Sequence, residues 1–207
     1  AGALTGSIYK GHVFWDTEIY LLPFYTFTDP PAARALLQYR FHTLPAARDR
    51  ARRLGYQGAL FAWESADTGE DVTPDTVIAP DGRVVQVLTG IQEHHISADV
   101  AYAVWQYWQA TADEAFFLAA GADILIETAR FWVSRGRLEP DGQYHIRTVI
   151  GPDEYHESVD DNAYTNVMAQ WNLERAADTV DWLRSRRSDV WPIVCERLQD
   201  KPNEPDS

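Results

Sequence analysis

Apolar residues recur at every third or fourth position over much of the chain, which is the spacing that places side chains on one face of an α-helix. From Glu93 to about Ala110 this spacing predicts a helix whose buried stripe consists of Ile96, Val100, Val104 and Trp108. Thr111 and Glu114 form a capping-box pattern, which predicts that another helix starts there. The buried positions of that second helix are Phe117, Ala120, Ile124 and Phe131, and Gly136 should end it.

Two more helices are predicted, one on each side of this pair. Asp29 followed by Pro30 is typical of an N-cap with proline in the first turn, so a helix is expected from there to a stop at Gly55. Nearer the other end of the chain, Ser158 or Asp161 is expected to cap the last helix. Its buried stripe consists of Ala169, Leu173, Ala176, Ala177, Val180 and Leu183.

The connections between the helices contain two β-like segments. Residues 64–92 form a long connection rich in Gly, Pro and Asp, in which residues 83–88, RVVQVL, resemble one arm of a hairpin. Residues 143–150, QYHIRTVI, predict a short strand. Because strands and helices do not alternate regularly, the pattern predicts a mainly α fold with short β excursions in connecting loops. The tail at residues 200–207 should be loose.

Composition and charge restrict the partners of the chain. Its 207 residues are 45% hydrophobic, as in a globular domain, and its 31 acidic and 18 basic residues give a formal net charge of −13. This charge would repel a phosphate backbone, so no nucleic acid is expected. No stretch approaches the length of an apolar membrane span, so no membrane partner is expected. The single Cys195 cannot form an internal disulfide, which favours a reducing, cytoplasmic location.

The motifs give no support for metal or nucleotide chemistry. The histidines at 12, 42, 94, 95, 145 and 156 show neither HExxH nor Cys/His spacing. The adjacent His94 and His95 would point about 100° apart on a helix, so a structural or substrate-contacting role is expected for them. The sequence also lacks a P-loop, GxGxxG and GxSxG. We therefore expect no metal ion and no cofactor.

Three short places combine an aromatic side chain with an acid. They are Trp15-Asp16, Trp63-Glu64 and Glu154-Tyr155. A pyranose has apolar C–H faces that pack on an indole and hydroxyls that donate to carboxylates, so such pairs suit sugar binding. Cleavage of a glycosidic bond also requires a carboxylic acid that stays protonated near neutral pH.

Each of these residues has a structural alternative. Trp15 and Trp63 could be core residues beside a solvated acid. Glu154 could be an acid at a helix N-terminus that complements the helix dipole. If Glu154 is catalytic, its neighbours in sequence are expected to raise its pKa. These neighbours are Asp153, Glu157, Asp160 and Asp161.

Three stretches, in this order, resemble the catalytic domain of glycoside hydrolase family 65. They are KGHVFWDTEIYLLPFY (10–25), FAWESADTGED (61–71) and IGPDEYHESVDDNAYTN (150–166). The family contains inverting phosphorylases of maltose, trehalose, kojibiose or nigerose, and also acid trehalases. The resemblance extends over about residues 1–185 and implies an (α/α)6 barrel. Since the chain supplies about half of such a barrel and starts without Met, residues 1–207 are interpreted as a single, partial catalytic domain.

The resemblance also implies the roles of individual residues. Glu154, in GPDEYH, resembles the general acid of the family. The residues implied to bind the sugar are Trp15, Asp16, Trp63, Glu64, Thr89 and His156. The match at Thr89 is short, and His156 is implied as a neighbour in the hydrogen-bond network of the acid.

The implied reaction is a single displacement in which inorganic phosphate, as co-substrate, attacks the anomeric carbon while Glu154 protonates the glycosidic oxygen. A hydrolase would instead need a second carboxylate to activate water. The family residues that bind phosphate belong to a later part of the barrel. Three interpretations stay open at this point: a disaccharide phosphorylase, a related hydrolase such as an acid trehalase, and an inactive sugar-binding fragment. A homodimer is an open alternative to a monomer.

Overall fold

The computed structural model describes residues 9–198, so the tail predicted to be loose lies outside the described range. Most described residues are helical, and the prediction of a mainly α fold with short β excursions is confirmed. The helical elements are η1 (Thr17–Leu21, a π-helical turn), α1 (Leu22–Thr28), α2 (Pro30–His42), α3 (Leu44–Arg53), α4 (Thr89–Gln92), α5 (Ile96–Thr111), α6 (Glu114–Phe116), η2 (Phe117–Gly121, also π-helical), α7 (Ala122–Arg135), α8 (Ala163–Arg186) and α9 (Trp191–Leu198). The strands are β1 (Thr76–Ile78), β2 (Val84–Gln86), β3 (Arg137–Leu138) and β4 (Tyr144–His145).

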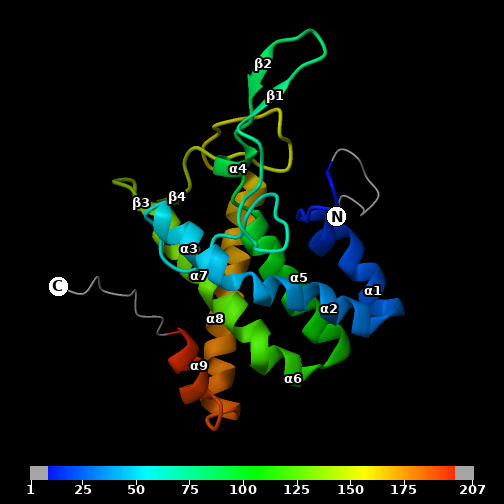
Figure 1. The fold of residues 1–207 in the computed structure, drawn as a ribbon. Coiled ribbons are helices and arrows are strands. Elements are labelled where there is room, and N and C mark those ends of the chain that lie inside the picture. Colours follow the sequence, from blue (N-terminus) through cyan, green and yellow to red (C-terminus); the bar gives the residue numbers. More distant parts are fainter. Residues whose placement is uncertain (1–8, 199–207) are drawn as a thin grey trace, which may run out of the picture.

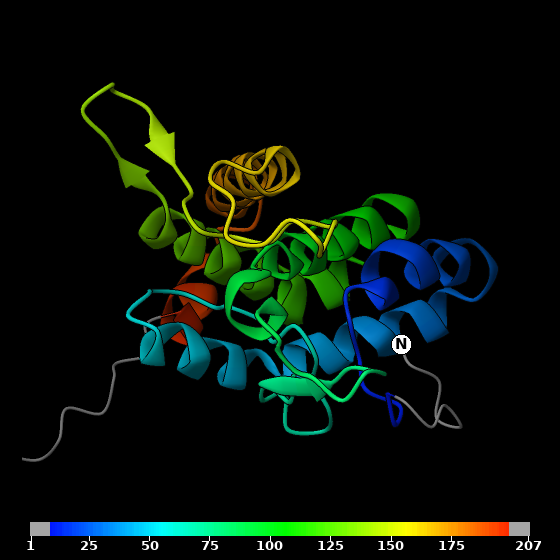
Figure 2. The ribbon, with the colours of Figure 1, turned by 90° about the horizontal axis from the view of Figure 1, so that it is seen from above.

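Helix α5 occupies the centre of the molecule. It packs against η1, α1 and α2, and also against η2, α7 and α8 (Figures 1 and 2). Ile96, Val100 and Val104 on its predicted stripe are fully buried in the main core, and Trp108 stacks on Phe117 with ring centroids 3.8 Å apart. The stripe predicted from the spacing is therefore confirmed.

The helix predicted from Asp29 to Gly55 is two helices, so this prediction is wrong as a single element. Its start is confirmed, because the Asp29 carboxylate accepts a hydrogen bond from the amide of Ala32 at 3.3 Å. The chain leaves helical geometry at Thr43 (φ −93°, ψ 0°), two residues before Pro45, which has no N–H to continue the ladder. Gly55, with φ +82°, follows the end of α3 as expected.

The predicted capping box at Thr111 and Glu114 is wrong. Thr111 is the last residue of α5, and Ala112 then turns the chain with a left-handed φ of 52°. Asp113 caps the next helix instead, since its carboxylate accepts from the Phe116 amide at 3.0 Å. The buried positions predicted for that helix are confirmed, and α7 ends before Gly136 as expected.

Neither predicted cap of the last helix is correct. The N-cap of α8 is Asn162, whose side-chain oxygen accepts from the Thr165 amide at 3.0 Å. The predicted stripe is correct in part: Ala169, Ala176 and Leu183 are buried, whereas Leu173 and Ala177 are exposed. The positions that complete the buried face are polar, namely Thr165, Asn172 and Thr179. One of them, Asn172, donates to the carbonyl of Leu125 in α7 at 3.2 Å.

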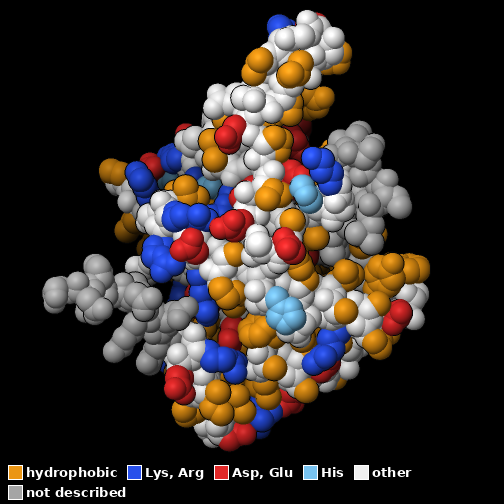
Figure 3. Space-filling view, in the orientation of Figure 1, with side chains coloured by type: hydrophobic (Ala, Val, Ile, Leu, Met, Phe, Trp, Pro, Cys, Tyr) orange, Lys and Arg blue, Asp and Glu red, His pale blue; other side chains and the backbone are white. Residues whose placement is uncertain are grey.

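Two antiparallel hairpins interrupt the helices. The arm predicted at residues 83–88 is confirmed: β2 pairs with β1 in a register that places Val85 opposite Val77. This hairpin projects from the helical body, and apolar side chains are exposed on it (Figures 1 and 3). Of residues 143–150, only Tyr144–His145 forms a strand, which pairs with β3.

The loops that carry the sequence motifs gather at one end of the helical layer. The connection from α3 to α4 and the loop before α8 lie beside each other at the upper end of α5 and α8 in Figure 1. The loop before α8 is joined to α4, which follows that connection, by a hydrogen bond of 3.1 Å from the Ile150 amide to the Gln92 carbonyl. Within residues 9–198, no helix combines the length and apolarity that a membrane crossing requires.

Candidate active site

One cleft of about 490 Å³ opens at this end of the molecule. It lies between the N-terminal segment, the loop after α3, the base of the β1–β2 hairpin and the loop before α8. Six of the residues proposed from the sequence line it: Trp15, Asp16, Trp63, Glu64, Thr89 and Glu154. The volume falls within the usual range of small-ligand sites, roughly 300–1,000 Å³. Three motifs that are far apart in the sequence therefore meet in one place.

Backbone pairing brings the first two motifs together. Val13 and Ser65 form an antiparallel bridge, with N–H to carbonyl distances of 2.8 and 3.1 Å. The amide of Val72 also donates to the Glu64 carbonyl at 2.9 Å, which folds the rest of the second motif back on itself. These bonds place Trp15 and Trp63 as neighbours on one wall of the cleft, with ring centroids 6.4 Å apart and a 32° tilt.

A buried ion pair holds the first motif against the helices. Arg40 of α2 donates from Nε and Nη2 to the two carboxylate oxygens of Glu18, at 2.7 and 2.8 Å. Both side chains are 1% exposed. Arg40 Nη2 also donates to the carbonyl of Phe14, the residue before Trp15, at 3.3 Å. The position of Trp15 and Asp16 thus depends on this pair.

Trp15 and Trp63 were expected either to pack in the core or to line a binding site, and the structure shows both features. Trp63 is 5% exposed and belongs to the main hydrophobic core, and the half-buried Trp15 packs against that core. Both indoles nevertheless contribute to the lining of the cleft. The acid beside Trp63 is not solvated: Glu64 is 8% exposed, and its Oε1 accepts from Nδ1 of His12 at 2.6 Å. This bond fixes the direction of a carboxylate that faces the cleft.

Glu154 belongs to a closed loop and not to a helix terminus, because α8 begins only after its N-cap Asn162. Two hydrogen bonds of 2.9 Å between Val149 and Val159 close this loop at its base. The side chain of Gln92 holds it further, since its Oε1 accepts from the Ser158 amide at 2.9 Å. The interpretation of Glu154 as a helix-capping acid is therefore wrong.

The predicted rise in the pKa of Glu154 is confirmed, but its cause differs from the prediction. Partial burial of the carboxyl in the cleft raises its pKa, the charge of Asp16 raises it further, and the positive charge of His95 opposes both. The neighbouring acids in the sequence are not among these causes, and two of them are bonded to other side chains. Asp153 contacts His156 at 2.7 Å, and Asp161 contacts both His145 and Arg147.

Two residues of the GPDEYH motif do not line the cleft. The Tyr155 side chain is almost fully exposed, and His156 is exposed and bonded to Asp153. The structure therefore does not bring the proposed sugar contact His156 to the other site residues.

A buried polar network behind the tryptophans was missed by the sequence argument. His95 donates from Nδ1 to Asp99 at 2.6 Å and from Nε2 to Glu93 at 3.2 Å, and the Tyr164 hydroxyl donates to the other Asp99 oxygen at 2.8 Å. Burial lowers the pKa of His95, but the hydrogen bonds that it donates to Asp99 and Glu93 raise this pKa to about 9 overall. Burial raises the pKa of Glu93 to about 7, and the charge of Glu154 adds to this rise.

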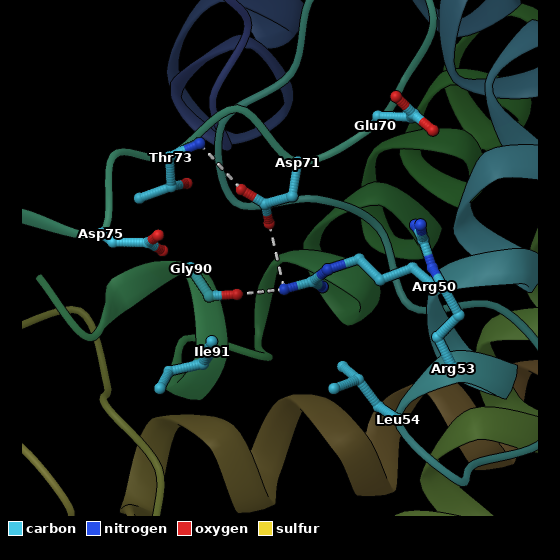
Figure 4. Close-up of a pocket in the computed structure, with 9 residues that line it drawn as sticks. All are labelled: Arg50, Arg53, Leu54, Glu70, Asp71, Thr73, Asp75, Gly90 and Ile91. Atoms are coloured by element: carbon cyan, nitrogen blue, oxygen red, sulfur yellow. Dashed lines mark hydrogen bonds and ion pairs between the residues drawn. The ribbon is translucent and has the colours of Figure 1, made fainter.

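A second hollow, of about 310 Å³, lies behind the second motif and contains the bonds that support it (Figure 4). Arg50 of α3 pairs with Asp71 at 3.0 Å and also donates to the Gly90 carbonyl. The Asp71 carboxylate in turn accepts from the amides of Thr73 and Trp63, each at 3.0 Å. Arg50 thereby fixes the loop of the second motif to α4, the short helix that carries Thr89.

The charges around the cleft suit a neutral polyol. Its described lining includes the carboxylates of Asp16, Glu64 and Glu154 and no Lys or Arg. Carboxylates accept hydrogen bonds from sugar hydroxyls, while an inorganic anion would be repelled. Within residues 9–198, no group of three His, Cys, Asp or Glu side chains is arranged to hold a metal ion.

This helical scaffold combines two indoles, three carboxylates and one acid of raised pKa in a single cleft, a combination typical of carbohydrate-active proteins. The sequence profile of the glycosyl hydrolase family 65 central catalytic domain matches residues 1–202. The chain belongs to glycosyl hydrolase family 65, as its motifs indicated.

Three of the similar proteins have names that refer to the same disaccharide, kojibiose. Kojibiose phosphorylase of Halothermothrix orenii is 49% identical over 207 residues, which cover 99% of this chain and 26% of that protein. Kojibiose hydrolase of Flavobacterium johnsoniae is 40% identical over 195 residues, or 94% of this chain and 27% of the hydrolase. A solved structure named "Putative kojibiose phosphorylase from human microbiome" has a TM-score of 0.80 at 29% identity, and the match covers 97% of this chain and 28% of that one. The chain thus spans about a quarter of the length of these relatives.

Proposed function

We propose that the protein containing this chain catalyses the inverting phosphorolysis of an α-linked glucose disaccharide, with kojibiose as the foremost substrate. The products are β-glucose 1-phosphate and a released sugar. The observation that carries the proposal is the convergence of two indole–carboxylate pairs and Glu154 on one cleft. The names of the phosphorylase relatives support both the reaction and the disaccharide.

In this mechanism the glucose unit to be transferred lies against Trp15 and Trp63, with its hydroxyls on Asp16 and Glu64. Glu154 gives its proton to the glycosidic oxygen as the bond from that oxygen to the anomeric carbon breaks. An oxygen of phosphate forms the new bond from the opposite face, so the configuration at the anomeric carbon inverts. Phosphate is already a nucleophile and needs no protein base, which is consistent with a site that requires only one proton donor.

The remaining parts of the proposal extend beyond the described cleft. Since its lining contains no Lys or Arg, the groups that hold phosphate are proposed to belong to other parts of the protein. The paired helices and the TM-score of 0.80 support an assignment of the chain to part of an (α/α)6 barrel. The cytoplasmic location, the homodimer, the single partial domain over residues 1–207 and the absence of a cofactor stay predictions.

Hydrolysis of kojibiose is the second candidate function, because the hydrolase relative is also similar over most of this chain. An inverting hydrolase needs a carboxylate base that activates water, typically about 6.5–9.5 Å from the acid. The higher identity to the phosphorylase favours phosphorolysis. An inactive sugar-binding protein is the third reading, and it predicts binding without cleavage.

The experiment that separates these functions is an incubation of the full natural protein with kojibiose, with and without inorganic phosphate. Maltose, nigerose and trehalose serve as linkage controls. The proposal predicts that cleavage depends on phosphate and that kojibiose reacts fastest. Equal release of glucose without phosphate would support the hydrolase, and glucose binding with no cleavage under either condition would support the inactive protein.

A further inference from the structure

We propose that His95 is a positioning residue that holds both indoles of the cleft wall in place. Its ring lies at right angles to the two tryptophans, with centroid distances of 4.8 Å to Trp15 and 5.5 Å to Trp63. The interplanar angles are 77° and 78°. No other contact in the described part of the chain joins one imidazole to both sugar-facing indoles. This inference rests on the proposed function, because it assigns His95 a task in the same site.

The orientation of His95 is fixed from both sides of its ring. Asp99, one helical turn further along α5, binds Nδ1, and Glu93, before the helix, binds Nε2. All three side chains are fully buried. Rotation of the imidazole would break both hydrogen bonds and leave two buried carboxylates without their partner, which is strongly unfavourable. The ring therefore has a single stable position behind the cleft.

Tyr164 connects this arrangement to a third element. Its hydroxyl binds Asp99 at 2.8 Å, and its ring lies 5.2 Å from that of His95 and 6.0 Å from that of Trp15. Tyr164 belongs to the first turn of α8, directly after the loop that carries Glu154. The network thus links α5 and the start of α8 to the indole wall, and His95 is its central member.

The contacts of His95 with the indoles are attractive as well as steric. Perpendicular aromatic pairs are favourable beyond the burial of area. A loss of two such contacts should therefore displace the indoles, which would reduce sugar affinity roughly tenfold to hundredfold.

The adjacent His94 offers a matched control. It is also buried, but its contacts lie on the side of α7: Nδ1 accepts from Arg135 at 3.1 Å, and the ring packs on Tyr56 and Phe131. Burial lowers its pKa to about 3, so it is neutral. Substitution of His94 removes a buried imidazole next to His95 without contact with either sugar-facing indole.

The test compares His95→Asn with His94→Asn in the full natural protein labelled with 5-fluorotryptophan. The ¹⁹F signals of Trp15 and Trp63 are assigned with Trp15→Phe and Trp63→Phe. We expect His95→Asn to shift both signals and to raise KM for the disaccharide roughly tenfold or more, with a smaller change in kcat. His94→Asn should lower the melting temperature but leave both signals and KM within twofold.

Two results would overturn the proposal. One is that His95→Asn leaves both fluorine signals in place; the other is that His94→Asn shifts them equally, which would indicate general destabilisation. If His95→Asn does not fold, His95→Gln replaces it, because its longer amide can still bond to a buried carboxylate while the ring that contacts both indoles is absent, and unshifted signals would then overturn the proposal. The fluorine signals can be measured without turnover, so they test the role of His95 even if the unsubstituted protein cleaves no disaccharide. Such a failure of cleavage would count against the proposed function alone.

Discussion

Replacement of Glu154 by glutamine removes the proton donor of the proposed reaction at a position that the fold tolerates. More than a third of the Glu154 surface is exposed even though its carboxyl is partly buried in the cleft, and its loop is held by the Val149–Val159 bridge and by Gln92, so the Glu154 side chain is not needed for either contact. Glutamine has nearly the same shape. Exposed substitutions of this kind change stability by less than about 0.5 kcal/mol, so we expect a melting temperature within about 2 °C of the parent.

The expected loss of turnover follows from the role of a general acid. Partial burial and the charge of Asp16 raise the pKa of Glu154, so the carboxyl holds its proton at higher pH than an ordinary glutamate. Proton transfer by such a group contributes about 10²–10⁴-fold, or roughly 2.7–5.4 kcal/mol of transition-state stabilisation. We expect kcat for Glu154→Gln to fall by this factor. KM should change less than about threefold, since the proposed mechanism assigns the binding of the sugar to the indole–carboxylate pairs.

The assay measures initial rates with kojibiose and with α-glucosyl fluoride, each with inorganic phosphate. Fluoride leaves without full protonation, so the loss caused by Glu154→Gln should be much smaller for the fluoride. Glu157→Gln is the matched control, because Glu157 is another exposed acid of the same loop and does not line the cleft. The reasoning is refuted if Glu154→Gln keeps kojibiose turnover within about threefold of the parent, or if both variants lose the same factor.

Three other substitutions test the surroundings of the acid. Asp16→Asn removes a charge that raises the pKa of Glu154. Because a general acid loses activity as the pH rises through its pKa, the basic limb of the pH profile of kcat/KM should move to lower pH. An unmoved limb would contradict this prediction. Gly151→Ala places a methyl group against the side chain of Asn162, which should displace the acid loop and lower kcat by roughly 10²-fold while calorimetry shows unchanged glucose affinity. Arg40→Met leaves a carboxylate buried without its partner and should cost about 3–5 kcal/mol in urea unfolding; a loss below about 1 kcal/mol would show that the pair is unimportant.

The sequence was most informative where a function depends on neighbouring residues. Each indole–carboxylate pair is local, so Trp15-Asp16 and Trp63-Glu64 could be proposed from their composition alone. Their convergence with Glu154 in one cleft was implied only by the resemblance to a family. His156 shows the limit of this approach, because membership of the same motif did not bring its side chain to the cleft.

Contacts between distant parts of the chain could not be predicted. His12 fixes Glu64 from 52 positions away, and the acid that raises the pKa of Glu154 is Asp16, not one of its sequence neighbours. The hydrogen-bond partners of His95 could not be predicted either. Glu93 and Asp99 are close to it in the sequence, but whether their side chains face the imidazole depends on where α5 begins. A charge pattern along one chain gives no distances between segments.

Helix ends were the least predictable part of the fold. Thr111 and Glu114 have the residue types of a capping box, but the left-handed turn at Ala112 moves the cap to Asp113. Apolar spacing also misassigned part of α8, because the neighbouring helix accepts a polar side chain, Asn172, at its backbone. In both cases more than one arrangement was compatible with the local sequence, and tertiary packing determined which of them forms.

The configuration of the first product tests the central claim most directly. The full natural protein is incubated with kojibiose and inorganic phosphate, and the anomer of glucose 1-phosphate is followed by ¹H and ³¹P NMR from the earliest time points. A single displacement assisted by Glu154 predicts β-glucose 1-phosphate as the first product, formed only when phosphate is present. Initial formation of the α-anomer, or of glucose at the same rate without phosphate, would contradict the account.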